Sequence, residues 1–355
     1  MTAVLTAPFI PISKNLSSHR AAQGVIYADQ LREAGIDLYV NMSLDRYVED
    51  HNTFDVMYVY HGNDWGGSLN LFGGLQEFPH VDNFVNFSKF KGKIYSVAID
   101  FPNYYDQLKH KVDVATAKNK FIDPRWHEVD WDNVLRMEKE SITVIPNDLV
   151  QYPNISIGDS HAICMYRPDW NNVSIPFKTL HGALNAGLKS FLPDRPLENV
   201  EFYFGNIDVR HHLLRQEDPE LATRTLVQRY FEQAKELNID VVIYELLPPE
   251  NESRSIPKTG WYNGTPFYGT RKERNEIRLI FNDEAKKQQS NTVHLFEWVS
   301  PLINKDGELD FMYMEKPKSV HLSRTAYPHW QGLDWNGLTE TLNKPVYHST
   351  LEDFL

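Results

Sequence analysis

The sequence is poor in cysteine and contains no long apolar run. Cys164 is the only cysteine among 355 residues, so the chain cannot form an internal disulfide, and a reducing compartment is expected. No stretch approaches the roughly 18 apolar residues that cross a bilayer. Residues 1–10 lack the basic start that is typical of a signal peptide. We therefore expect a cytoplasmic protein that does not associate with membranes.

Basic residues are also in deficit. The chain has 36 Lys and Arg against 48 Asp and Glu, a formal net charge of −12. This balance disfavours broad binding to nucleic acid, which depends on neutralising phosphates with cations. Nucleic acid could still bind through a local basic patch, because net charge does not describe how the charges are distributed.

Apolar residues are nevertheless abundant enough for hydrophobic cores, at 41% hydrophobic and 13% aromatic. The chain is longer than a typical single-core domain. Strand-like runs lie at 36–40, 54–60, 93–99, 142–145, 155–157, 200–204, 239–247 and 292–297. Helix-like segments between them predict parallel sheets with helices on both faces. We expect a two-domain α/β protein, with a Rossmann-like domain over 1–148 and a flavodoxin-like three-layer domain over 149–355.

A polar cluster follows the run at 155–157 without a break. Residues 158–161 read Gly-Asp-Ser-His. A strained turn at the end of a strand can expose a nucleophilic serine, which here is Ser160. The alternative is a simple polar turn in which Asp159 or Ser160 caps the next helix.

Two further polar clusters follow later in the chain. Residues 205–208 read Gly-Asn-Ile-Asp after the run at 200–204, and residues 319–322 read Ser-Val-His-Leu. The carboxyl ends of parallel strands share one edge of a sheet, where open α/β sheets bind their ligands. We therefore expect the three clusters to lie close together.

This order of motifs resembles the SGNH/GDSL hydrolase family over about residues 155–325. The resemblance implies that Ser160 is the nucleophile and His321 the general base, with Asp159 in the same catalytic motif. It also implies three oxyanion donors, namely the backbone N–H groups of Ser160 and Gly182 and the side chain of Asn206. These roles agree with the chemistry, because a serine hydroxyl needs an imidazole to accept its proton and an oxyanion needs preorganised donors.

The sequence departs from the family pattern at two positions. Ile207 stands where the family has asparagine, and Lys318 stands where it has aspartate, three residues before His321. His321 would then be oriented by another group, or Ser160 and His321 would act as a dyad. A degenerate site that binds without turnover is the third possibility.

The variant motifs resemble a bacterial and phage branch of hydrolase-like proteins, many of which are encoded beside carbohydrate-modifying genes. The shared Gly-x-Ile-Asp-x-Arg pattern spans 205–210. Within it, Asp208 and Arg210 form either a buried ion pair that shapes the site or a binding site for a substrate anion. His161 either lines the substrate pocket or is a loop histidine satisfied by the backbone.

The N-terminal part carries a second, shorter resemblance. Residues 69–74 and 92–100 resemble the Rossmann-like half of phage DNA β-glucosyltransferases, which implies glycosyl transfer from a nucleotide sugar. The loop at 61–74 has five glycines and is either a ligand loop or a flexible connection.

Metal binding and a cationic helix face are the remaining possibilities. His211 and His212 are adjacent, so their side chains diverge on a regular element, and we expect neither a metal nor another cofactor. The three arginines at 271, 274 and 278 predict a solvated helix face or, as the alternative, an anion-binding edge.

The leading hypothesis is an SGNH-like serine esterase or O-acyltransferase. Its substrate would be a carbohydrate, a glycosylated molecule or another acylated small molecule. The alternatives are a nucleotide-sugar-dependent glycosyltransferase and a catalytically degenerate binding protein.

Overall fold

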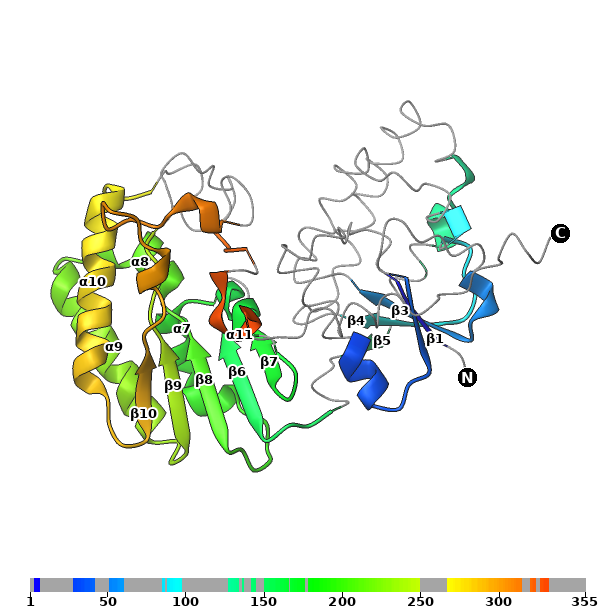
Figure 1. Ribbon diagram of the computed structural model, residues 1–355, viewed down its shortest axis with the longest axis horizontal. Helices are drawn as coiled ribbons and strands as arrows, with labels where there is room; N and C mark the ends of the chain where they lie inside the picture. Colours follow the sequence, from blue (N-terminus) through cyan, green and yellow to red (C-terminus); the bar gives the residue numbers. More distant parts are fainter. Residues whose placement is uncertain are drawn as a thin grey trace. The chain divides into compact units, whose positions relative to one another are not determined.

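Figure 1 shows the computed structural model of the chain. The description covers residues 3–6, 28–41, 51–60, 85–86, 88–97, 127–133, 136, 142–144, 150–165, 167–175, 178–249, 267–314, 320–323 and 326–331. The chain divides into two compact units, Met1–Gln151 with Leu333–Leu355, and Tyr152–Gly332. The second unit ends before the expected limit of 355, and no run rich in Gly, Pro or Ser marks that end in the sequence.

The first unit contains a five-stranded parallel sheet in the order β2-β1-β3-β4-β5. Its strands are β1 (Ala3–Thr6), β2 (Leu38–Asn41), β3 (Val56–Tyr60), β4 (Lys93–Val97) and β5 (Ile142–Val144). The sequence did not predict β1, because four residues at the start of the chain carry no recognisable period. The strand is nevertheless central, since it pairs with β2 on one side and β3 on the other.

The second unit also contains a five-stranded parallel sheet, in the order β10-β9-β8-β6-β7 (Figure 1). Its strands are β6 (Asn154–Gly158), β7 (Asn171–Ser174), β8 (Asn199–Tyr203), β9 (Asp240–Tyr244) and β10 (Val293–Phe296). The chain runs outward from β6 to β7 and then returns to β8, so the strand order reverses between β6 and β8. Ligands bind open α/β sheets at such a switch point. The two sheets confirm the expected α/β class.

The described helices of the second unit lie between these strands in the chain, apart from α11, which follows β10. They are α7 (Leu180–Ala186), α8 (Asn206–His211), α9 (Pro219–Lys235), α10 (Arg271–Gln288) and α11 (Pro328–Gln331). Short 3-10 turns are η4 (Ser160–Met165), η5 (Leu188–Phe191), η6 (Leu213–Arg215), η7 (Ser300–Leu302) and η8 (Phe311–Tyr313). Within the described part of the chain, no helix has both the length and the apolarity to cross a bilayer.

The two faces of the sheet follow the alternation of β8. Phe202 faces α9, where its ring lies 6.3 Å from that of Tyr230. Tyr203 points to the opposite face and packs against Tyr244 and Trp298, with ring centroids at 5.3 and 6.1 Å. Neighbouring side chains of a strand point to opposite faces, so one strand supplies both layers of the core.

Local sequence sets where the two long helices begin. Asp218 caps α9 by accepting from the Leu221 amide, and Pro219 is the first helical residue, as the sequence predicted. Thr270 caps α10 and forms a reciprocal capping box with Glu273.

The structure corrects the expectation of a solvated helix face at the arginines of α10. The solvated face that was expected is wrong, because Arg274 is 0% and Arg278 2% exposed. The guanidinium of Arg274 donates to the Gly269 carbonyl and lies over the Phe267 ring at 4.4 Å. Arg278 donates to the side chain of Asn275. The charged positions alone could not reveal this, because the carbonyl and the ring come from a turn outside the helix.

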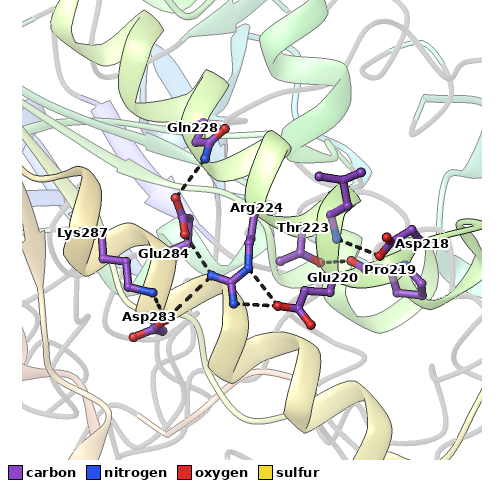
Figure 2. Close-up of polar contacts among 10 residues, drawn as sticks. Asp218, Pro219, Glu220, Thr223, Arg224, Gln228, Asp283, Glu284 and Lys287 are labelled. Atoms are coloured by element: carbon purple, nitrogen blue, oxygen red, sulfur yellow. Dashed lines mark hydrogen bonds and ion pairs between the residues drawn. The ribbon is translucent and has the colours of Figure 1, made fainter.

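Helices α9 and α10 are joined by a polar network centred on Arg224 (Figure 2). Arg224 donates to Glu220 on its own helix and, at 3.0 Å, to Glu284 of α10. Glu284 also accepts from Gln228 and Gln288. Burial alone would raise the pKa of Glu284, but these hydrogen bonds outweigh it and lower the pKa. The network therefore stabilises the fold above the usual carboxyl pKa and loses that effect as the pH falls through the lowered pKa.

We predict that Arg224→Met destabilises the protein more than Glu220→Gln. The first change leaves the buried Glu284 carboxylate short of a donor, whereas the second removes only an exposed partner. Urea unfolding midpoints at pH 7 measure the difference, which should shrink in acid as Glu284 is protonated. Equal losses in the two variants would contradict the prediction.

Candidate active site

Ser160 lies directly beyond the carboxyl end of β6, at the switch point. Strand β6 ends at Gly158, where an added Cβ would overlap the carbonyl oxygen of Tyr203 on β8. The Asp159 amide then donates to the same carbonyl at 3.1 Å. Only glycine allows the backbones this close an approach, so Gly158 fixes where the turn carrying Ser160 begins.

Ser160 and His321 lie within hydrogen-bond distance. The two atoms, Ser160 Oγ and His321 Nε2, are 3.1 Å apart, although the residues are 161 positions apart in the chain. This is the reach that a general base needs for a serine hydroxyl. The structure thus brings together the two residues that the motifs at 158–161 and 319–322 indicated.

Strand β7 supplies two buried side chains that hold the Ser160 turn. Ser174 Oγ donates to the Asp159 carbonyl at 3.2 Å, and Asn172 Nδ2 donates to the Ala162 carbonyl at 2.9 Å. The backbone is therefore anchored on both sides of Ser160. Sequence reasoning missed β7 and these residues, because a short run with two adjacent asparagines resembles a loop. The role of these amide and hydroxyl groups shows only in the folded structure, where they donate to carbonyl groups of the Ser160 turn.

The segment that carries His321 is anchored by Tyr327. The Leu322 amide donates to the Tyr327 hydroxyl at 3.2 Å. Tyr327 is 1% exposed, and its ring packs at 5.7 Å from that of Trp298. Two residues further on, the ring of His329 on α11 lies 5.7 Å from that of Tyr244. Sequence reasoning also missed Tyr327, since an isolated tyrosine gives no sign of which amide it will accept from.

Asp159 and His161 form a fully buried pair beside this segment. Asp159 Oδ1 accepts from the His161 amide and from His161 Nδ1, both at 2.8 Å. On the other side of the ring, Arg210 Nη2 lies 2.8 Å from His161 Nε2. A guanidinium can only donate, so Nε2 accepts and the ring proton is on Nδ1. Asp159 therefore contacts His161 rather than His321.

Among the described residues, two of the expected oxyanion donors have no acceptor, and the third has one. The Ser160 amide donates to no acceptor in the described part of the chain, and the buried Asn206 Nδ2 has no hydrogen-bond partner there. The other end of that amide, Asn206 Oδ1, accepts from the Leu247 amide at 3.3 Å. The Gly182 amide, by contrast, donates to Thr179 Oγ1 at 3.0 Å as part of the N-cap of α7. Its assignment as an oxyanion donor is therefore corrected.

Asp208 occupies a different position from the one expected. Of the two alternatives, the ion pair with Arg210 is not among the contacts of the described residues; Asp208 instead accepts from the amides of Leu180 and His181, at 2.6 and 3.2 Å. The sequence could not reveal that the first turn of α7 lies next to this carboxylate, because the two are 27 and 28 residues apart in the chain. Burial raises the pKa of Asp208 to about 7, and the negative charge of Asp159 acts in the same direction.

Two expectations remain, one about metal binding and one about an N-terminal part that binds a nucleotide sugar. Across the described ranges, no three His, Cys, Asp or Glu side chains form a candidate metal site. The glycine-rich loop at 61–74, which includes the stretch at 69–74 that resembles the glucosyltransferases, lies outside the described residues, and so does residue 318. Of the stretch at 92–100, strand β4 and Gly92 are described.

Comparison with known proteins returns similar structures. No model of a known protein family matches the sequence, and no curated protein matches it. One similar structure is a GDSL-like lipase from Bacteroides thetaiotaomicron, at 16% identity over 53% of this chain and 88% of that chain, with a TM-score of 0.37. Another is the psychrotrophic esterase EstA from Pseudoalteromonas sp., at 17% identity over 54% and 100%, with a TM-score of 0.30. The chemistry considered below rests on the geometry of the site.

We predict that Tyr327→Phe slows the reaction of Ser160 with a fluorophosphonate by about tenfold, because a small displacement of His321 weakens proton transfer. Only the hydroxyl that accepts from the Leu322 amide is removed. Labelling rates measured by intact-protein mass spectrometry test this. Tyr268→Phe, at an exposed tyrosine, is the control. A wild-type labelling rate in Tyr327→Phe would contradict the proposed anchoring.

We also predict a pH dependence of stability from Asp208. Its raised pKa means that the unfolded chain loses this proton at lower pH than the folded protein does. Its contribution to stability is therefore complete in acid and falls as the pH rises from about 4 to 7. The unfolding free energy of wild type should decline relative to that of Asp208→Asn over this range. Urea unfolding of both proteins at pH 5 and pH 8 measures it, and a constant difference would contradict the prediction.

Proposed function

We propose that the protein is a serine hydrolase that cleaves acyl esters, with Ser160 as nucleophile and His321 as general base. The observation that carries this proposal is the 3.1 Å distance between Ser160 Oγ and His321 Nε2. Its support is the position of Ser160 beyond β6, at the switch point where open α/β sheets bind ligands.

In the first step, Ser160 Oγ attacks the ester carbonyl carbon while its proton passes to His321 Nε2. The carbonyl oxygen becomes an oxyanion, and the proposed donors to it are the Ser160 amide and Asn206 Nδ2, which have no acceptor among the described residues. Each such donor is worth roughly 3 kcal/mol of barrier. His321 then gives the proton to the leaving alkoxide, and an acyl-serine remains.

In the second step, a water molecule attacks the acyl-serine. His321 accepts one proton from this water and returns it to Ser160 Oγ, which releases the carboxylic acid. A sugar hydroxyl in place of this water would make the same site an O-acyltransferase. Both reactions need the same nucleophile and base, and only the acceptor differs.

The proposal also specifies the class of substrate. We propose an acyl group carried by a carbohydrate, a glycosylated molecule or another acylated small molecule. The resemblance of the pattern at 205–210 to the hydrolase-like branch supports this choice. Release of acetate from acetylated mono- and oligosaccharides, compared with release from simple alkyl acetates, tests it.

Ester hydrolysis by Ser160→Ala and His321→Ala tests the function itself. With p-nitrophenyl acetate, we expect each variant to lose at least about 1,000-fold in kcat/KM, because the nucleophile and its base act as one unit. Ser190→Ala, at an exposed serine of η5, is the matched control and should keep the wild-type rate. Wild-type activity in Ser160→Ala, or an inert wild-type protein, would overturn the proposal.

A further inference from the structure

A buried chain of polar groups lies next to the Ser160–His321 pair without touching Ser160 Oγ. Asp159, His161 and Arg210 come from two segments and are connected through the His161 ring at 2.8 Å on each side. Asp159 and His161 are both 0% exposed. Buried charged groups are expensive to desolvate, so their retention needs a structural or functional reason.

His161 contacts the segment of His321 in two ways. The two imidazole rings are 5.2 Å apart and meet edge to face at 60°. In addition, the ring packs against the carbonyl of Val320, which belongs to the peptide group that precedes His321; its oxygen lies 3.2 Å from His161 Nε2, and this is a packing contact, because Nε2 carries no proton when it accepts from Arg210. On the other side of His321, the Leu322 amide is held by Tyr327. The general base is thus placed between two buried side chains.

We propose that His161, fixed by Asp159 and Arg210, is the positioning residue for His321. It would replace the orienting carboxylate that this chain lacks at residue 318, where it has lysine. The inference rests on the proposed function, because it concerns how the general base of that reaction is held.

The charges around His161 agree with this role. The groups that face its ring are Asp159, Arg210 of α8, His321 and Tyr203 of β8, whose ring lies at 6.0 Å. Asp159 Oδ1 accepts from Nδ1, and Nε2 accepts from Arg210, so charged partners engage both nitrogens of the ring. The ring therefore has a fixed orientation against His321.

His161→Asn is the informative variant, because its short amide can still donate to Asp159 but cannot fill the space of the ring against His321. Active sites are counted by stoichiometric fluorophosphonate labelling, and p-nitrophenyl acetate hydrolysis is then expressed per active site. We expect kcat to fall by about tenfold with KM little changed, and the acid limb of the kcat/KM profile to move. His294→Ala, at an exposed histidine of β10, is the control for loss of a histidine.

A purely structural role would give fewer active sites with wild-type kcat and a wild-type acid limb per site, and this result would overturn the inference while the function stands. Amide hydrogen exchange at residues 320–323 adds a readout that needs no turnover. Faster exchange in His161→Asn supports positioning, and unchanged exchange overturns it. An inert wild-type protein would instead refute the proposed function, and the exchange result then decides separately whether His161 holds the segment.

Discussion

The close approach of β6 to β8 is the constraint on which the site depends. Gly158 lies against the Tyr203 carbonyl, and the Asp159 amide donates to that same oxygen. The turn that follows can then begin in only one place, and β7 anchors it from the other side through Ser174 and Asn172. Ser160 lies partly exposed at the sheet edge, and its neighbours, rather than its own side chain, fix the backbone.

His321 reaches Ser160 through a different kind of restraint. Its described residues, 320–323, belong to no strand or helix; they pair with the backbone at 313–314, with Tyr327 and Trp298 on one side and His161 on the other. Asp159 serves both halves, since its backbone is bound to β7 and β8 and its carboxylate holds His161.

Sequence alone predicted the α/β class and most strands, because apolar runs are local signals. The pairing of Ser160 with His321 came from the resemblance to the SGNH/GDSL hydrolase family. It missed β1 and β7, which are too short or too polar to show a period. It also misplaced Gly182, whose amide donates to the N-cap Thr179 of its own helix, and Asp208, which accepts from α7 amides 27 and 28 residues away in the chain. The buried arginines of α10 show a related limit, because the Gly269 carbonyl and the Phe267 ring that contact Arg274 lie in the turn before the helix, whose conformation the sequence did not reveal.

The most direct test of the central claim is the site of covalent modification by a fluorophosphonate. The protein is treated with the probe, digested, and mapped by tandem mass spectrometry alongside His321→Ala. The account predicts a single phosphonyl adduct on Ser160 in the wild type and a strongly reduced amount in His321→Ala. An unmodified Ser160, or an adduct on another residue instead, would contradict it.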